Sequence, residues 1–285
     1  GSEMCIRDRE SIADSLQVYD KVCEIEGVTP YYHYIFTSQN MAAAESDVTE
    51  EALRLFEGNR ILHVYFNFLP EDIYHKLVMH YELDEEKYAD LDKVPAIVLN
   101  DVSKWNEEGK QIHVPVLKDT CSHLQSIRTG YDEEKDININ AGNPIIREND
   151  REFIIADGYT EKRVALEDYA GTVLQIGDIV DNDSYEGIML DNNMEGFRQY
   201  SREMEFIYPL AMADAVLSQL SNKDRAGTMM YFQAEDHKKA YDTISILLQS
   251  YDNIYAYDAA EAEEQDRAAL ILVNVFCYGF IILIS

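Results

Sequence analysis

The sequence is poor in basic residues, cysteine, proline and tryptophan. Lys and Arg together number 24 against 54 Asp and Glu, which gives a formal net charge of −30. A negative surface opposes contact with nucleic acid, because such contacts depend on Lys and Arg displacing phosphate counterions. The charge favours a basic protein partner, or imitation of nucleic-acid charge, over direct nucleic-acid binding. A well-solvated acidic surface without a partner is the simplest alternative.

Cysteine is scarce and scattered, at Cys5, Cys23, Cys121 and Cys277. No two of these residues form a C-x-x-C pair, so the sequence contains neither a zinc ribbon nor a dithiol redox site. Widely separated cysteines among many carboxylates fit a reducing compartment better than a disulfide framework. We therefore expect a cytoplasmic protein.

The short motifs of common catalytic sites are also missing. There is no G-x-S-x-G turn, no phosphate-binding loop with its lysine and no G-x-G-x-x-G pattern. Glu71 and His75 lie one helical turn apart, but His80 falls on another face and the HExxH pattern is absent. Residues 178–186 begin like a calcium loop but have the wrong residues where an EF-hand needs a ligand and then glycine. We assign no catalytic residue, metal ligand or cofactor.

The N-terminal segment is set aside from functional reasoning. Gly1-Ser2 is typical of a tag remnant, and residues 3–9 resemble translated sequencing-adapter sequence. We therefore interpret residues 1–9 as an artefact and assign no role to Cys5.

At the other end, residues 268–284 form an uncharged run. The run has roughly 17 residues, the lower limit for a transmembrane helix. Asn274 and Gly279 interrupt it, and no Lys or Arg follows it as an anchor. We expect residues 268–285 to be an apolar tail that is buried or artefactual, with a membrane anchor as the alternative.

The hydrophobic pattern predicts a mixed α/β fold. A hydrophobic fraction of 46%, with 20 Tyr and 10 Phe, excludes wholesale disorder. Alternating or continuous apolar residues predict strands at 61–68, 94–99 and 112–117. Apolar residues at helical spacing predict helices at 10–27, 71–81, 194–208, 210–220 and 240–251, and a capping pattern predicts one between 47 and 58. We expect an α/β body with a mixed sheet over residues 10–190, then a helical part over residues 191–267.

The clearest organisation lies in residues 143–180. Residues 144–147 and 152–155 predict two strands joined by a turn, and Asp157-Gly158 predicts a tight corner. We expect Thr160 to cap a helix that runs to Tyr169, followed by a strand over residues 172–180. A glycine corner at a helix N-terminus can hold an anion, because its amides are unpaired and the helix dipole favours negative charge.

This segment resembles the core of the ParB/sulfiredoxin-like superfamily, over residues 120–180. The resemblance rests on Pro-Ile-Ile-Arg-Glu-Asn, then Glu-Phe-Ile-Ile-Ala-Asp-Gly, then Arg163, Ala165 and Ala170-Gly171. Upstream, residues 124–130 are similar to the helix that precedes this hairpin in ParB-type proteins. Family members include DNA-partition CTPases, regulators of DNA-modification systems and an ATP-using sulfinic-acid reductase.

The resemblance implies an anion- or nucleotide-binding site at Asp157, Gly158, Lys162 and Arg163. The family places a phosphate-binding Arg within three residues of the glycine, whereas residues 159–161 here are Tyr-Thr-Glu. Lys162 and Arg163 are therefore the candidates to replace that arginine. No Cys stands beside Gly158, so the reductase chemistry is not implied.

The sequence leaves three functional hypotheses open. The first is a non-enzymatic or weakly nucleotide-binding regulator with a degenerate ParB-like core, from a phage or mobile defence system. The second is an acidic protein that binds a basic partner or mimics DNA. The third is a structural subunit whose Tyr-rich faces and apolar C-terminus are buried between copies. A basic protein or self-association is expected as partner ahead of nucleic acid.

Overall fold

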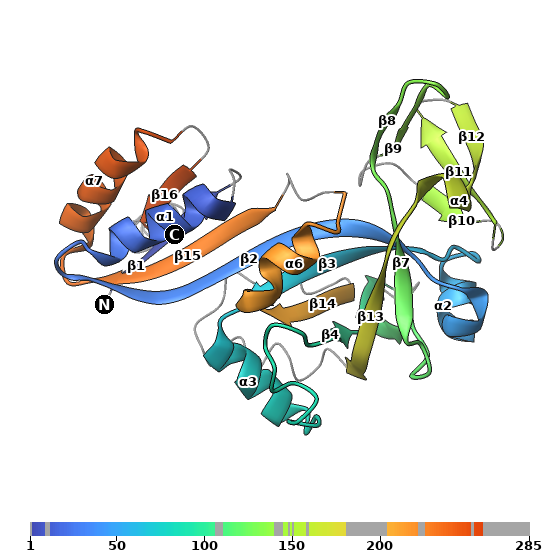
Figure 1. The fold of residues 1–285 in the computed structure, drawn as a ribbon, viewed down its shortest axis with the longest axis horizontal. Coiled ribbons are helices and arrows are strands. Elements are labelled where there is room, and N and C mark those ends of the chain that lie inside the picture. Colours follow the sequence, from blue (N-terminus) through green and yellow to red (C-terminus); the bar gives the residue numbers. More distant parts are fainter. Residues whose placement is uncertain are drawn as a thin grey trace, which may run out of the picture. The chain divides into compact units, whose positions relative to one another are not determined.

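The computed structural model describes residues 2–8, 12–105, 111–139, 145–147, 149, 151–157, 160–180, 204–221, 226–251 and 254–258. The chain divides into two compact units (Figure 1). Unit 1 combines Gly1–His33 with Gly227–Ser285, and unit 2 is the intervening segment Tyr34–Ala226. The described residues form helices together with parallel and antiparallel strand pairs, so the predicted mixed α/β class is confirmed.

The described residues of unit 1 form four strands and two helices, and the second strand continues into unit 2 after His33. In chain order they are β1 (Ser2–Asp8), α1 (Ile12–Cys23), β2 (Val28–Ala42), β15 (Gly227–Ala234), α7 (His237–Leu248) and β16 (Ile254–Asp258). The strand order is β16-β1-β15-β2, and β1 is antiparallel to both of its neighbours. This is the order of a split βαβ, or ferredoxin-like, arrangement. Unit 2 is inserted between its second and third strands.

The core of unit 1 joins both helices to β15. Because apolar residues recur at helical spacing, α1 and α7 each bury one stripe. The buried residues are Val18, Val22, Val28, Met230, Phe232, Ala234, Ala240, Ile244 and Leu248. Asp236 caps α7 by accepting a hydrogen bond from the Lys239 amide at 3.1 Å. The helices predicted at 10–27 and 240–251 are confirmed with shifted ends.

Residues 2–8, which the sequence suggested setting aside, form an inner strand of unit 1. β1 pairs with β15 from Ser2↔Ala234 to Asp8↔Thr228 and with β16 from Met4↔Asp258 to Asp8↔Ile254. The origin of the segment as an artefact stays a prediction. Its pairing nevertheless completes the sheet, because β1 joins β16 to β15.

Unit 2 is built on a sheet that closes on itself. Its strands, in spatial order, are β2, β3 (Ile61–Leu69), β14 (Met204–Pro209), β4 (Ala96–Leu99), β13 (Ala170–Val180) and β7 (His123–Ile127). The ring is completed where β7 also pairs with β2, through Met41↔Ser126 and Ala42↔Gln125. Closure matters because it removes the exposed edges of an open sheet.

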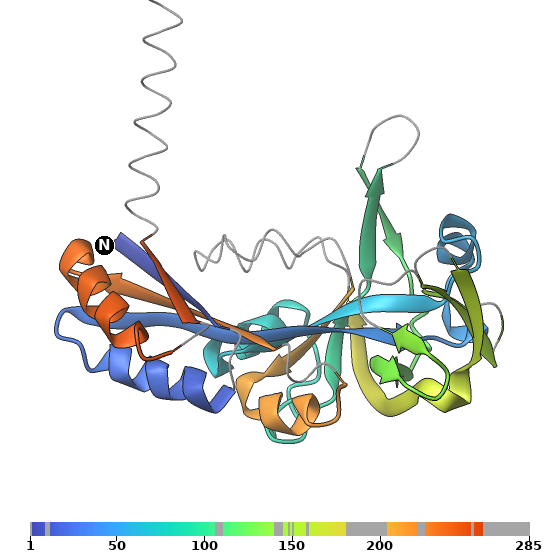
Figure 2. The same ribbon diagram turned by 90° about the horizontal axis from the view of Figure 1, so that it is seen from above.

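Several predicted elements of unit 2 are confirmed. The alternation of residues 61–68 gives β3, in which Val64, Phe66 and Phe68 are fully buried. The helices predicted between 47 and 58 and at 71–81 correspond to α2 (Glu50–Leu55) and α3 (Glu71–His80). Unit 2 also contains the hairpin β5 (Asp101–Trp105) and β6 (Gln111–Pro115), together with η1 (Glu45–Asp47), η3 (Leu210–Met212) and α6 (Ala213–Leu217). Figure 2 shows the β5–β6 hairpin projecting from the sheet of unit 2.

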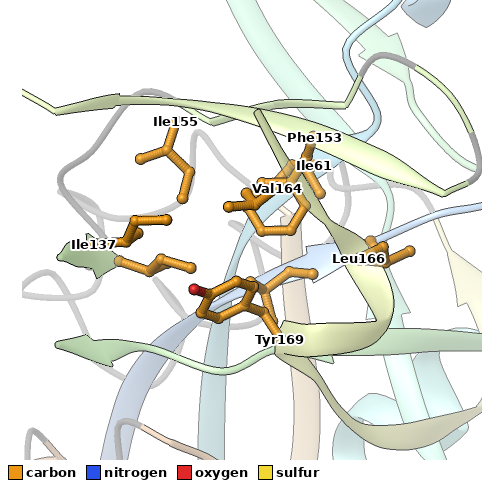
Figure 3. Close-up of a cluster of buried hydrophobic side chains, with 10 residues drawn as sticks. Ile61, Ile137, Phe153, Ile155, Val164, Leu166 and Tyr169 are labelled. Carbon is orange, nitrogen blue, oxygen red and sulfur yellow. The ribbon is translucent and has the colours of Figure 1, made fainter. Parts of the chain in front are cut away.

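The chain makes an excursion between β7 and β13. It forms the pair β8 (Gly130–Asp132) and β9 (Ile137–Ile139), the sheet β10 (Ile145–Arg147), β11 (Glu152–Asp157) and β12 (Thr160–Ala165), and the short helix α4 (Leu166–Tyr169). Figure 3 shows the apolar cluster that packs this excursion on the rest of unit 2. Its members are Ala42, Ile61, Ile127, Ile137, Ile139, Phe153, Ile155, Val164, Leu166 and Tyr169.

Two predicted helices in this region are wrong. Residues 160–165 form β12, and only Leu166–Tyr169 is helical. Residues 124–130, expected to resemble a ParB-type helix, instead belong to β7 (His123–Ile127) and reach the start of β8 at Gly130. β12 alternates between more buried and more exposed positions, and Val164, Leu124 and Ile127 are buried. Tertiary packing of this kind overrides local helix propensity.

The predicted helical part after residue 190 is correct only in places. The helix predicted over 210–220 corresponds to η3 and α6. Of the helix predicted over 194–208, residues 194–203 lie outside the described residues, and the rest belongs to β14 (Met204–Pro209). All six residues of β14 are buried, and a fully buried strand lacks the alternation that separates strands from helices. β15 and β16 add two further strands to this part of the chain.

Residues 268–284 lie outside the described residues. Among the residues that the structure does describe, no helix has the length and apolar content needed to cross a membrane.

Removal of residues 1–9 tests the role of β1. We expect the shortened chain to lose protection of backbone amides from exchange in β15 and β16, because both strands form backbone hydrogen bonds with β1. The amides of β3 and β14 in unit 2 should stay protected. Hydrogen exchange followed by mass spectrometry measures this directly. Unchanged protection in β15 and β16 would show that unit 1 does not need this strand.

Candidate functional site

The four residues predicted to bind an anion lie in and around one β-hairpin. Asp157 ends β11 and is paired with Thr160, the first residue of β12. Gly158 is outside the described residues. Lys162 and Arg163 follow on β12, opposite Ile155 and Ile154. The predicted corner is therefore a strand-to-strand connection, and the helix N-terminus that supported the anion site is absent at Thr160.

Lys162 and Arg163 point away from each other. Successive strand residues face opposite sides of a sheet, and Lys162 shares the side of buried Ile155. Its Nζ donates a hydrogen bond to the Asp136 carbonyl. Arg163 Nη1 instead contacts Glu152 Oε2 at 3.3 Å. The hairpin does not bring the two cations onto one face, so anion binding by these four residues stays a prediction.

A small hollow of about 550 Å³ lies beside β12, and its lining residues include Lys135, Lys162 and Arg163. Lys135 Nζ forms an ion pair with Asp168 Oδ2 at 2.7 Å. The hydrogen bond to Asp168 raises the pKa of Lys135. The Lys135 ammonium also lies 5.2 Å from the centroid of the Tyr169 ring. Each of the three cations is thus engaged within the chain.

A larger hollow of about 1060 Å³ lies between β7, the turn before β11 and α4. The turn is fixed by Asn149, whose Oδ1 accepts hydrogen bonds from the amides of Arg151 at 2.8 Å and Glu152 at 3.0 Å. The lining residues are Gln125, Asn149, Arg151, Glu152, Ala165, Leu166, Glu167 and Ala170. We call this space the large hollow. It combines one arginine, two carboxylates, two amides and an apolar floor, which suits a ligand with both polar and apolar parts.

A buried tyrosine and an ion pair fasten the segment after α3 to β13. Tyr88, 1% exposed, donates a hydrogen bond to Asp178 Oδ2 at 2.6 Å. Lys87 Nζ donates to the same oxygen at 2.8 Å and to the Gly177 carbonyl at 2.6 Å. A side chain at Gly177 would collide with the Tyr88 hydroxyl. Asp178 is therefore a structural carboxylate, whereas sequence analysis had considered it only as the start of a rejected calcium loop.

The hydrogen bonds at Asp178 outweigh the cost of its burial. Partial desolvation opposes the charged form, but donation from Lys87 and Tyr88 holds the pKa of Asp178 below its usual value. Burial and the bond to Asp178 raise the pKa of Tyr88 far above its usual value, so the phenol stays protonated.

Exposed carboxylates gather on α3 and on the segment that joins it to β4. They are Glu71, Asp72, Glu82, Asp84, Glu85, Glu86, Asp90 and Asp92, and we call them the acidic surface. Within the same segment, Lys87 and Lys93 are paired with Asp178 and Asp90. Met79 is 62% exposed at the end of α3. The segment therefore offers negative charge next to an apolar side chain.

A buried carboxylate on β14 was not found by sequence analysis. Glu205 is 0% exposed, and its Oε2 accepts a hydrogen bond from Asn67 Nδ2 at 2.6 Å. On the neighbouring strands β3 and β2, His63 Nδ1 lies 3.2 Å from Asn40 Oδ1. The only signal was a glutamate inside the apolar run Met204–Pro209. Pairing with an amide offsets part of the cost of burying the carboxylate.

The structure does not assemble the residues of a metal or thiol site within its described part. No three His, Cys, Asp or Glu side chains among the described residues could hold a metal ion together. Cys121 Sγ donates to the His123 carbonyl at 3.5 Å and not to its ring. Burial raises the pKa of Cys121 to about 11, which keeps the thiol neutral.

Comparison of the chain with protein-family models, curated proteins and solved structures finds no match. The protein can therefore be classified only by its fold, which is a split βαβ unit with a closed-sheet unit inserted in it.

Asp178→Asn should reduce the pH dependence of stability. Because the pKa of Asp178 is lowered in the folded state, its contribution is present above the usual Asp pKa of about 4 and is lost as the pH falls through the lowered value. We expect the difference in unfolding free energy between wild type and variant to be largest near neutral pH and to shrink toward about pH 3. Urea unfolding at several pH values measures it.

The matched control is Asp119→Asn, at an exposed position outside this contact. A pH-independent difference between wild type and Asp178→Asn would contradict the charge argument and leave only a loss of packing.

Proposed function

We propose that the chain is a non-catalytic binding module whose unit 2 engages a basic protein segment. The observation that carries the proposal is the acidic surface on α3 and the segment after it, with exposed Met79 at the helix end. A net charge of −30 attracts basic partners over long range, and such fields speed association more than they strengthen it. A cytoplasmic location belongs to the proposal and is supported by the free thiols Cys23 and Cys121.

The arrangement of the cations favours this function over nucleotide binding. A nucleotide site needs cations that converge on phosphate oxygens, whereas Lys162 and Arg163 lie on opposite faces of β12 and each has a partner. The acidic surface is solvated and accessible. The ParB-like regulator remains a separate hypothesis, and it rests on the sequence resemblance alone.

Neutralising part of the acidic surface tests the proposal. A phage-displayed library of 12-residue peptides is selected on wild type, and we expect Lys- and Arg-rich peptides to be enriched. The triple variant Glu82→Gln/Glu85→Gln/Glu86→Gln should bind the selected peptides about tenfold more weakly at low salt. The loss should shrink at high salt, because screening weakens exposed charges.

The matched control is Glu24→Gln/Glu26→Gln/Glu235→Gln, which removes three exposed carboxylates from unit 1. Equal weakening in both variants would point to net charge alone. Selection of peptides without basic residues would overturn the proposal.

A second candidate function, membrane attachment, is favoured by the uncharged residues 268–284. We propose that this run anchors the module to a bilayer, since burial of its apolar side chains in lipid is favourable and it contains no charge to desolvate. The acidic residues just before it, from 261 to 266, would stay in water.

Liposome flotation tests this attachment. The full chain should float with neutral phosphatidylcholine vesicles, and a chain ending at residue 267 should remain at the bottom of the gradient. Insertion should survive a high-salt wash, because it is apolar and not electrostatic. Failure of the full chain to float would leave the run as an ordinary protein segment.

A further inference from the structure

We propose that the large hollow of unit 2 binds the C-terminal end of a short peptide, with Arg151 holding the terminal carboxylate and Glu167 a basic side chain. The inference rests on the proposed function, because it names a site at which a basic partner would bind. It concerns a part of unit 2 other than the acidic surface, so the two can be tested apart.

The size and lining of the large hollow suit a few peptide residues. Ligand sites in proteins are commonly about 300–1,000 Å³ and mostly apolar, with a few polar groups that fix orientation. This space, about 1060 Å³, is slightly larger than that range, and its lining is more polar than apolar. Leu166, Ala165 and Ala170 supply the apolar lining, while polar groups come from β7, from the turn before β11 and from α4.

Among the residues that line the large hollow, Arg151 is the best candidate to bind a ligand. In the described part of the chain its guanidinium makes no hydrogen bond or ion pair, whereas Arg163 contacts Glu152 and Arg128 donates to the Asp168 carbonyl. The backbone of Arg151 is held on both sides, because its amide donates to Asn149 Oδ1 at 2.8 Å and its carbonyl accepts from Leu166 N at 2.6 Å. A guanidinium that has no partner among the described residues, on a backbone held by these hydrogen bonds, can bind a carboxylate through two parallel hydrogen bonds.

Two further side chains of the large hollow have no hydrogen-bond partner among the described residues. Glu167 on α4 and Gln125 on β7 make no side-chain hydrogen bond to the described residues. Glu167 can accept from a Lys or Arg of the ligand, and the Gln125 amide can both donate to and accept from a peptide backbone. By contrast, Glu152 is occupied by Arg163. The hollow thus offers one cation, one anion and one amide.

The overall charge selects among ligands that could satisfy this set. A chain of net charge −30 repels polyanions, so a nucleotide or an acidic peptide meets an unfavourable field before it reaches Arg151. A peptide with a single terminal carboxylate and at least one basic side chain is attracted by the field and matches both charged groups. Recognition of a terminal carboxylate together with neighbouring side chains is an established mode of peptide binding.

The probe is a library of Lys-containing pentapeptides with free C-terminal carboxylates, from which the tightest binder is titrated by fluorescence anisotropy. Its C-terminal amide is titrated in parallel. We expect the amide to bind wild type about tenfold more weakly, and Arg151→Gln to lose about tenfold for the free acid but little for the amide. Glu167→Gln should weaken the binding of peptides that contain Lys and leave the binding of their norleucine analogues unchanged.

Arg54→Gln is the matched control, since Arg54 is exposed on α2 and outside the large hollow. Equal binding of acid and amide, or an Arg151→Gln variant that binds the acid as wild type does, would overturn the inference. So would the absence of any saturable pentapeptide binding.

The Glu82→Gln/Glu85→Gln/Glu86→Gln variant separates this inference from the proposed function. If basic 12-residue peptides need the acidic surface and Arg151→Gln leaves them unaffected, the proposed function stands and the large hollow is not its site. If neither set of variants changes binding of any basic peptide, the proposed function fails as well.

Discussion

The pairing of β7 with β2 is the contact on which the rest of unit 2 depends. Only Met41↔Ser126 and Ala42↔Gln125 are paired there, yet they turn an open sheet into a ring. Gln39 adds a hydrogen bond from its side chain to the Ile127 carbonyl. On the other side of β7, Gly171 lies so close that a side chain would collide with the Ser126 hydroxyl. β7 is therefore fixed by close backbone approach on both of its sides.

The fixed position of β7 determines the region that follows it. The excursion from residue 128 to residue 169 begins and ends on β7 and β13, which are antiparallel neighbours. Its small sheet packs on Ile127 and Ala42 through one apolar cluster (Figure 3). Gln125 of β7 and Ala170 of β13 line the large hollow. The proposed ligand site is thus located by the strand pairing that closes the sheet.

The sequence predicts the elements whose pattern is local. β3, α3 and α7 show clear alternation or helical spacing, and their burial agrees with it. β12 was missed because it carries charged residues, of which Arg163 is paired with Glu152 and Lys162 donates to a backbone carbonyl. β14 was missed because it is buried at every position. The candidate site could be predicted only in part. Spacing identified the hairpin, but the convergence of Gln125, Arg151 and Glu167 depends on contacts between residues far apart in the chain.

The insertion also has a mechanical meaning. β1 and β16, the first and last described strands, are antiparallel neighbours within unit 1. While they stay paired, a tension applied between Ser2 and Asp258 is carried across that pair and does not reach unit 2. The start of β1 and the end of β16 lie at the same end of the pair, as Met4↔Asp258 shows, so tension opens its hydrogen bonds one after another. Because β1 is also paired with β15, unit 2 would be stretched only after both strand pairs have opened, and unit 1 thus shields the inserted unit from tension.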